Sequence, residues 1–358
     1  MFTYQKLIII LNLAAVLHAG NIKISIYEQE DSQWNWEDTQ AYTAKLCDTL
    51  NLPRPSDLEN VKAEFYKPRL LSHFSIGTPP QPLKMCFDIT SPDMRVRSSS
   101  CAGLLCVLLK FTAFIFEKSS SFINLGYSYL YEGKNRMFVD NLIIGGAVLK
   151  EQTFIEAAES LPSYADAWFG LSQGESKSGY STVLQNMFEK LKIDEFTVIL
   201  QSYSDPKQVG EIYFGDVALA ADYIITAPSN YITQWQILTT YDGIAHGAFL
   251  DFNSPDIIFD NLAHFNKLIS ESGAQIGKDN NYYVKSIKNI SSLIFVIDDK
   301  PITVSPEAYF EPVGTVYKLK VRYVEGLFCL GAPFYSKKWI TYNFKTNMIS
   351  IAELSERE

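Results

Sequence analysis

A short pattern that occurs twice constrains this chain more than any other feature of its sequence. The letters FDITSPD cover residues 87–93, and LDFNSPD covers residues 250–256. Each copy places an aspartate, Asp88 or Asp251, at the end of an apolar run typical of a strand. Because the copies lie about 160 residues apart, they predict two similar lobes that contribute one carboxylate each. Either copy alone has a simpler explanation, since an aspartate that closes a strand usually forms a turn.

Length and composition agree with two β-rich lobes. A chain of 358 residues exceeds what one hydrophobic core usually organises. Hydrophobic residues make up 47%, with 21 Tyr and 23 Phe, which excludes disorder and favours strands. The formal charge of -9, without a basic run, argues against a nucleic-acid partner.

The first residues resemble a secretory signal. Lys6 precedes an apolar run over 7–17, and small residues follow at 19 and 20. That run is too short to span a bilayer comfortably, although an N-terminal anchor or a buried strand stays open as an alternative. No second apolar stretch reaches membrane length, so we expect a secreted or lysosomal (lumenal) protein without a membrane span.

The next segment, from Asn21 to about Glu64, is polar and acidic and shows no sustained strand alternation, which indicates an appended segment. Beyond it, short apolar runs end at turn signals. We expect strands at 71–76, 83–87, 141–144, 196–200, 211–214, 293–297 and 339–344. Helical spacing of apolar residues predicts helices at 182–191, 257–270 and 305–310.

The order of these landmarks resembles the pepsin-like aspartic proteases, the family of pepsin, cathepsin D and renin. The similarity extends from Phe74 to Ile351. It rests on FSIGTPPQ at 74–81, the run from Phe87 to Cys101, KSSSF at 118–122, WFGL at 168–171, and further matches at 140–146, 196–200, 215–216, 235–237, 304–309 and 330–331.

The resemblance implies an all-β, two-lobed fold with a central peptide-binding cleft. The corresponding domains are a signal peptide at 1–19, an acidic propeptide-like segment at 20–66, an N-terminal lobe at 67–195 and a C-terminal lobe at 196–358. We expect a monomer whose partner is a peptide or protein in the cleft, with no cofactor and no metal.

The family's chemistry uses two carboxylates that share one proton and hold a water between them. By position these are Asp88 and Asp251. Ser91 and Ser254 match the hydroxyl residues that hydrogen-bond the outer carboxylate oxygens. The ionised carboxylate takes a proton from the water while the protonated one polarises the scissile carbonyl, so activity requires acidic pH.

Both catalytic triplets depart from the family's Asp-Thr-Gly. Ile89 and Phe252 replace threonines whose hydroxyls join the two loops beneath the carboxylates, so an apolar plug is expected there. Thr90 and Asn253 replace glycines that let the backbone pass close beneath the carboxylates. We expect the first loop to be the more distorted, because Asn adopts unusual dihedrals more readily than a β-branched residue. In addition, Arg95 stands where the family has the tryptophan that supports the flap tyrosine.

The flap is shortened, and Tyr127, Tyr129 and Tyr131 compete for the role of its tyrosine. We favour Tyr131 because Glu132 and Gly133 follow it. The alternative is that all three are ordinary strand residues.

The remaining motifs give minor expectations. Cys101 and Cys106 match the family's first-lobe disulfide loop, and their spacing can close a small loop. Cys86 and Cys329 are predicted to be buried strand cysteines, and Cys47 is expected to make none of the family's second-lobe bridges. Asn289 begins the single glycosylation sequon that we find.

Two hypotheses follow. The altered triplets favour a homologue that binds extended peptides while its hydrolysis is impaired or lost. Retention of both aspartates supports the alternative, an active aspartic endopeptidase. A metal- or nucleophile-dependent hydrolase is weakly supported, since the four histidines show no ligand spacing.

Overall fold

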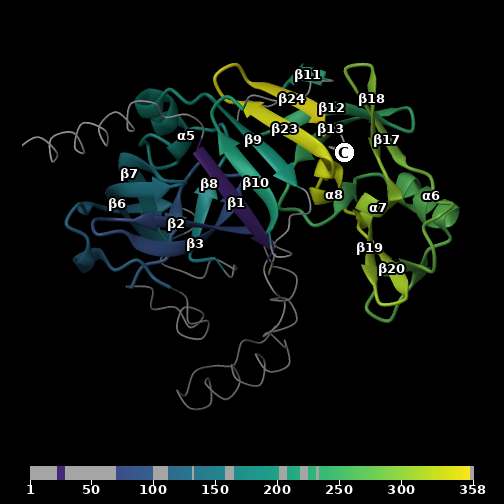
Figure 1. Ribbon diagram of the computed structural model, residues 1–358, viewed down its shortest axis with the longest axis horizontal. Helices are drawn as coiled ribbons and strands as arrows, with labels where there is room; N and C mark the ends of the chain where they lie inside the picture. The colour runs from purple at the N-terminus through teal and green to yellow at the C-terminus, as the bar shows by residue number, and fades with distance from the viewer. Residues whose placement is uncertain are drawn as a thin grey trace, which may run out of the picture.

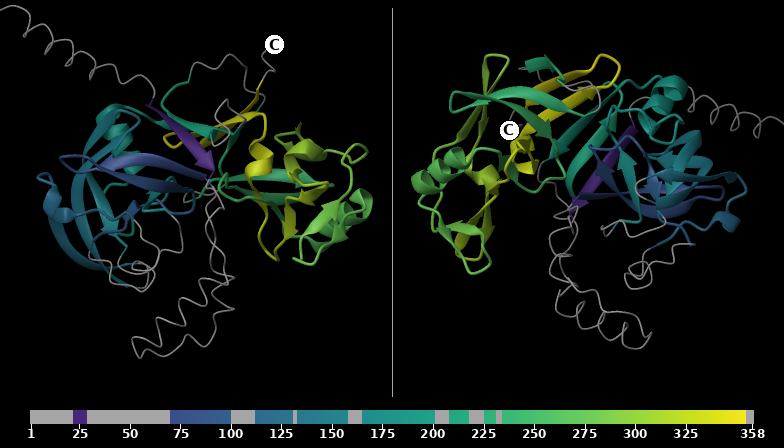
Figure 2. Two further views of the ribbon diagram at one scale, coloured as in Figure 1. Left: turned by 60° about the horizontal axis from the view of Figure 1, so that its bottom comes forward. Right: turned by 180° about the vertical axis from the view of Figure 1, so that it is seen from behind.

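The computed structural model describes residues 22–28, 70–99, 112–130, 133–157, 165–200, 208–217, 225–230 and 234–354. Strands dominate, as the sequence predicts, and they form two lobes on either side of a shared group of central strands (Figures 1 and 2). No helix among the described residues is long and apolar enough to cross a membrane.

A thirteen-stranded sheet extends through the first lobe and the centre of the molecule. Its order is β11-β24-β23-β9-β10-β1-β2-β3-β8-β4-β7-β6-β5. The strands are β1 (Ile22–Glu28), β2 (Leu70–Ile76), β3 (Gln81–Asp88), β4 (Arg95–Val96), β5 (Ile123–Leu130), β6 (Gly133–Ile144), β7 (Ala147–Glu156), β8 (Ala167–Gly170), β9 (Glu195–Leu200), β10 (Gln208–Phe214), β11 (Ile225–Pro228), β23 (Lys338–Asn343) and β24 (Met348–Glu353).

The second lobe contains two smaller sheets. The seven-stranded sheet has the order β18-β17-β12-β13-β22-β14-β21. It comprises β12 (Gln236–Tyr241), β13 (Ile244–Leu250), β14 (Ile257–Phe259), β17 (Leu293–Ile297), β18 (Lys300–Val304), β21 (Val321–Tyr323) and β22 (Cys329–Leu330). The four-stranded sheet comprises β15 (Gln275–Ile276), β16 (Tyr282–Val284), β19 (Phe310–Val313) and β20 (Val316–Leu319).

One expected helix is partly wrong. The pattern at 257–270 predicted a helix throughout, but Ile257–Phe259 forms β14, and α6 (Leu262–Ser272) begins later. The three strand residues are all buried and pair with β21 and β22. Asn261 then caps the helix, because its side chain accepts hydrogen bonds from the amides of Ala263 and His264.

The other two predicted helices are present with adjusted ends. Thr182 forms a capping box with Gln185 at the start of α5 (Val183–Asn186), which continues as a π-helical turn, η2 (Met187–Leu191). The third is α7 (Pro306–Tyr309). Two short helices were not predicted, η1 (Phe116–Lys118) and α8 (Ala332–Tyr335).

The acidic N-terminal segment contains a strand, which corrects the expectation that it lacks strand alternation. In β1, drawn in purple in Figure 1, Ile22, Ile24 and Ile26 are buried while the residues between them are more exposed. This strand pairs antiparallel with β10 from Ile22 to Tyr27 and with β2 at its end. The beginning of the segment is therefore built into the sheet that joins the lobes.

Candidate active site

The first-lobe carboxylate ends a buried strand and is fixed by its own loop. Asp88 is the last residue of β3, whose side chains are buried from Met85 onward. Its Oδ1 accepts hydrogen bonds from the Thr90 amide at 3.0 Å, the Thr90 hydroxyl at 2.7 Å and the Ser91 amide at 3.1 Å. This Asx-type turn is the local reason that the chain leaves the strand at this point.

The second-lobe carboxylate occupies the equivalent position. Asp251 directly follows β13, and its Oδ1 accepts a hydrogen bond from the Asn253 amide at 3.0 Å. The Ser254 amide donates to the Asp251 carbonyl at 2.9 Å. Each copy of the repeated pattern thus forms a similar turn, so the duplication predicted from sequence is present in three dimensions.

A glycine beneath each loop completes the similarity. Gly170 and Gly331 belong to strands or turns that lie against the loops, and a Cβ on either would collide with loop backbone. On Gly170 it would lie 2.4 Å from the Pro92 carbonyl carbon, and on Gly331 it would lie 2.1 Å from the Asp256 carbonyl oxygen. Backbone approach this close requires glycine in both lobes.

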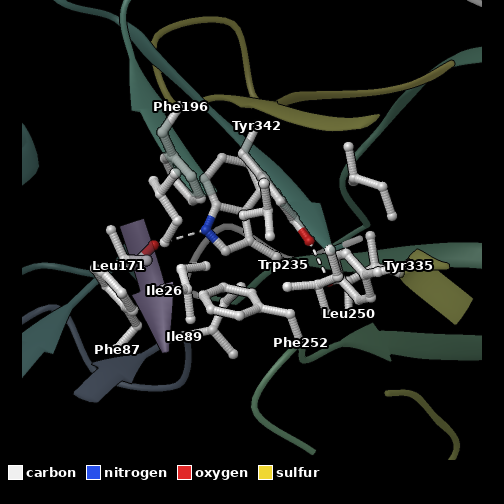
Figure 3. Close-up of a cluster of buried hydrophobic side chains, with 14 of the residues drawn as sticks. Ile26, Phe87, Ile89, Leu171, Phe196, Trp235, Leu250, Phe252, Tyr335 and Tyr342 are labelled. Atoms are coloured by element: carbon white, nitrogen blue, oxygen red, sulfur yellow. Dashed lines mark hydrogen bonds between the residues drawn. The ribbon is translucent and has the colours of Figure 1, made fainter. Parts of the chain in front are cut away.

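The expected apolar plug beneath the carboxylates is confirmed. Ile89 is 5% exposed and Phe252 is fully buried. Phe252 packs between Phe87, at a ring-centroid distance of 5.9 Å, and Tyr335, also at 5.9 Å. Figure 3 shows these side chains in one cluster with Trp235, whose indole N–H donates to the Leu171 carbonyl at 2.7 Å.

Asn253 provides a polar link between the loops that the sequence did not predict. Its side-chain amide donates a hydrogen bond to the carbonyl of Phe87, one residue before Asp88, while its buried Oδ1 has no hydrogen-bond partner among the described residues. Among the described residues, neither Thr90 nor Asn253 has a positive φ. The loops therefore form their turns without a left-handed residue at the two positions where the family has glycine, and a greater distortion of the first loop remains a prediction.

A second unpredicted contact involves the cation that replaces the family's tryptophan. Arg95 of β4 donates from its guanidinium to Oδ2 of Asp88 at 2.9 Å, and both side chains are largely buried. The guanidinium also stacks on Trp168, 4.3 Å from the ring centroid. Both oxygens of Asp88 are consequently hydrogen-bonded to protein groups, and its charge is balanced by a neighbouring cation.

Asp251 has different surroundings. Burial raises the pKa of its carboxyl to about 6; the Asn253 amide opposes this shift, and the charge of Asp88 adds to it. Asp251 is partly buried and lines a cavity of about 340 Å³. Ile89 and Thr90 of the first lobe line the same cavity, with the remaining walls from 234 to 329 in the second. The cavity therefore lies where the lobes meet.

The two predicted supporting serines lie in the loops, where each side chain makes a hydrogen bond with loop backbone. The Ser254 hydroxyl donates to the Asp256 carbonyl at 2.9 Å, and a hydroxyl has one proton to donate, so it does not donate to the Asp251 carboxylate as expected. The Ser91 oxygen accepts from the Asp93 amide at 3.3 Å.

Some of the remaining predicted residues lie outside the described part of the chain, and others can be placed. Tyr131, Cys101 and Cys106, together with Cys47, lie outside the described residues. Cys86 and Cys329 are free and buried, as predicted, and burial raises the pKa of both thiols. Asn289 is exposed in a turn, a position that an attached glycan can occupy.

Comparison with known proteins agrees with this architecture. The family profile of eukaryotic aspartyl proteases matches residues 70–354. The chain is 28% identical to vacuolar protease A of Neurospora crassa over 320 residues, covering 80% of this chain and 79% of the relative. It is 26% identical to gastricsin of Cavia porcellus over 314 residues, covering 78% of each. Cathepsin D of Chionodraco hamatus is 25% identical over 179 residues, covering 46% of this chain and 44% of the relative.

A match over most of the chain establishes the family. The protein belongs to the eukaryotic aspartyl proteases and has their all-β, two-lobed, pepsin-like fold.

Proposed function

We propose that this chain is a secreted or lumenal homologue of the pepsin-like proteases that binds extended peptides between its lobes and has impaired or lost hydrolysis. The observation that carries the proposal is the ion pair between Arg95 and Asp88. In the family mechanism one carboxylate accepts a proton from a water held between the two aspartates.

Asp88 is poorly suited to that role. Three donors approach its Oδ1, and the Arg95 guanidinium occupies Oδ2 at 2.9 Å. A carboxylate oxygen that already accepts charge-assisted hydrogen bonds has less capacity to hold and deprotonate a water. Catalysis depends on reacting groups held in the productive geometry, and misplacement by about 1 Å can cost on the order of a hundredfold in rate.

The peptide-binding half of the proposal rests on the cavity. Its volume of about 340 Å³ and its walls from both lobes suit side chains of an extended peptide. Apart from Asp251 and Arg322, the described side chains that line it carry no charge. Loss of hydrolysis therefore does not imply loss of the cleft.

The alternative is an active endopeptidase that uses Asp88, Asp251 and a bridging water at acidic pH. One observation favours it, namely the pKa of Asp251 at about 6. Below that pH Asp251 carries a proton, while the Asp88 carboxylate faces a guanidinium. A protonated Asp251 would supply the proton that the mechanism requires on one of the two carboxyls.

A lumenal or secreted location is part of the proposal. It is supported by the signal-like order of residues 1–19 and by similarity to relatives that include vacuolar protease A of Neurospora crassa. Any residual activity would require an acidic compartment, because the mechanism needs one protonated carboxyl.

Cleavage and binding measured on the same variants test the proposal. Cleavage of an acid-denatured protein is followed from about pH 3 to pH 7 for wild type, Arg95→Trp, and Arg95→Trp combined with Asp88→Asn. Peptide binding is measured by fluorescence anisotropy. We expect wild type to bind peptides without cutting, Arg95→Trp to gain acid cleavage, and the double variant to lose it. Efficient acid cleavage by wild type that either Asp88→Asn or Asp251→Asn abolishes would establish the alternative instead.

A further inference from the structure

Four residues that pair directly across neighbouring strands form a row in the seven-stranded sheet of the second lobe. The last residue of the row is a cation. Phe249 of β13 pairs with Cys329 of β22, Cys329 pairs with Ile258 of β14, and Ile258 pairs with Arg322 of β21. Residues directly opposite each other on paired strands lie on the same face. All four line the cavity beside Asp251, so the row forms one of its walls.

Arg322 stands at the open end of this row. Its strand, β21, is the last of the seven-stranded sheet, and its side chain is 48% exposed. The other three members are apolar and are buried or half-buried. The wall thus offers apolar contacts next to Asp251 and a cation at the outer end.

The donors of Arg322 are largely unused among the described residues. Its Nε lies 3.6 Å from Oδ2 of Asp256, beyond hydrogen-bond distance. Asp256 has a closer partner in Lys320, whose Nζ lies 3.2 Å from Oδ1 and also approaches Glu311 at 3.7 Å. A guanidinium has five N–H donors in a planar fork that matches a carboxylate.

We infer that Arg322 makes the cleft selective for peptides that carry an acidic side chain, an inference that rests on the proposed peptide-binding function. Asp251 and Arg322 are the charged residues among those that line the cavity. At pH values below about 6 the Asp251 carboxyl is protonated, which leaves Arg322 as the charged lining group. An anionic side chain then meets a cation on this wall, while Asp256, whose carboxylate is paired with Lys320 at 3.2 Å, does not line the cavity.

The spacing of the strands fixes roughly where that side chain lies. Three strand spacings separate Phe249 from Arg322, which is about 14 Å. An extended peptide rises by about 3.3 Å per residue, and the side chains of Arg and Glu span part of the gap. The acidic residue is therefore expected about two or three positions from the peptide bond nearest the two aspartates.

Peptide pairs that differ by one charge test the inference. The probes are fluorescent eight-residue peptides with Leu and Phe at the centre, and each of the remaining positions in turn carries either Glu or Gln. Binding is measured at about pH 5.5, where Glu is ionised. For wild type we expect Glu to bind about fivefold more tightly than Gln at one or two positions. That preference should shrink at 1 M salt, where charges are screened beyond about 3 Å.

Two variants assign the preference to its residue. Arg322→Gln should abolish the preference for Glu, so that the Glu and Gln peptides of each pair bind with equal affinity. Lys267→Gln is the matched control, because the Lys267 side chain is also 48% exposed and paired with a carboxylate, at 2.8 Å from Asp242, but does not line the cavity. It should leave the preference intact.

The possible failures are distinguishable. Tight binding without a preference for Glu at any position, or a preference that persists in Arg322→Gln, would overturn the inference and leave the proposed function standing. If wild type binds no peptide of either series, the proposed function and the inference fall together.

Discussion

The side-chain amide of Asn253 donates a hydrogen bond to the carbonyl of Phe87, which joins the second-lobe loop to the strand that carries Asp88. In the family, two threonine hydroxyls make the crossover between these loops. Here Ile89 and Phe252 occupy those positions as buried apolar side chains, so the polar link has moved by one residue. The loops are joined by a different set of contacts, not left unjoined.

This link predicts graded effects of substitution at Asn253. Asn253→Ala removes the hydrogen bond but also the unpartnered Oδ1, so we expect a loss of about 1 kcal/mol in the free energy of unfolding. Asn253→Asp places a charge against the Phe87 carbonyl and should cost about 3 kcal/mol or more at neutral pH. Urea unfolding measures both values. Equal stability of the two variants would contradict the proposed direction of the hydrogen bond.

The two aspartates are expected to respond oppositely to replacement by Asn at neutral pH. The folded state raises the pKa of Asp251 from 3.8 to about 6, so ionisation at pH 7 costs up to about 3 kcal/mol of stability. The stability contributed by the protonated Asp251 carboxyl is fully present below about pH 4 and is lost as the pH rises through about 6. Asp251→Asn should therefore raise the unfolding temperature at pH 7 and leave it nearly unchanged at pH 4.

Asp88→Asn has the opposite expected sign, because it removes the charge that balances the largely buried Arg95. Breaking such a pair from one side typically costs about 3 kcal/mol. Thermal unfolding at pH 7 of Asp88→Asn, of Asp251→Asn and of the double variant Asp88→Asn with Arg95→Gln checks this. In the double variant, Arg95→Gln should restore part of the stability that Asp88→Asn loses. A stabilising effect of Asp88→Asn alone would show that the ion pair does not form.

The sequence predicted the frame of this site but not its contacts. The repeated pattern placed Asp88 and Asp251 at the ends of matching strands, because strand alternation and turn residues are local signals. The resemblance to the family also predicted the apolar plug, because Ile89 and Phe252 stand where the family has threonines in a buried crossover.

The contacts that change the chemistry depend on distant parts of the chain. The sequence shows that Arg95 replaces the family's tryptophan. It does not predict the ion pair with Asp88, because that contact depends on how β4 lies beside β8. The strand β1 could have been found, because Ile22, Ile24 and Ile26 alternate with polar residues. The acidic composition of the longer segment around it concealed that short pattern.

The paired glycines give a test of the duplicated geometry. Gly170→Ala and Gly331→Ala should each cost more than about 3 kcal/mol, because the added Cβ meets backbone atoms that cannot move independently. Gly247→Ala is the control, since its Cβ would meet the flexible end of Gln236 at 2.9 Å. Comparable urea midpoints for all three variants would contradict the tight packing of glycine beneath both loops.

The disulfide between Cys101 and Cys106 remains a prediction. Alkylation of the unreduced protein followed by mass spectrometry should find these two thiols protected. Cys86 and Cys329 should react after denaturation, because both are free and buried. Modification of Cys101 and Cys106 without reduction would reject the bridge.

Restoring the family's residues is the strongest test of the proposed impairment of hydrolysis. Four changes rebuild the two triplets: Ile89→Thr, Thr90→Gly, Phe252→Thr and Asn253→Gly. The structure adds a fifth, Arg95→Trp, because the guanidinium occupies Oδ2 of Asp88 whatever the triplets contain. We expect the fivefold variant to cleave denatured protein at acidic pH well above wild type, and the fourfold variant to gain much less. Neighbouring residues in a site act as a unit, so single changes within the two triplets should show little.

The repair carries a stability cost that must be measured alongside activity. Phe252 is fully buried between two rings, so its replacement by Thr should cost about 3 kcal/mol. A statine-type transition-state analogue binds through correctly posed carboxylates and should bind the repaired protein more tightly than wild type. The same five changes with Asp88→Asn should neither cut nor bind it tightly. Wild type that already cuts efficiently and is blocked by the analogue would mean that Arg95 and the altered triplets are compatible with catalysis.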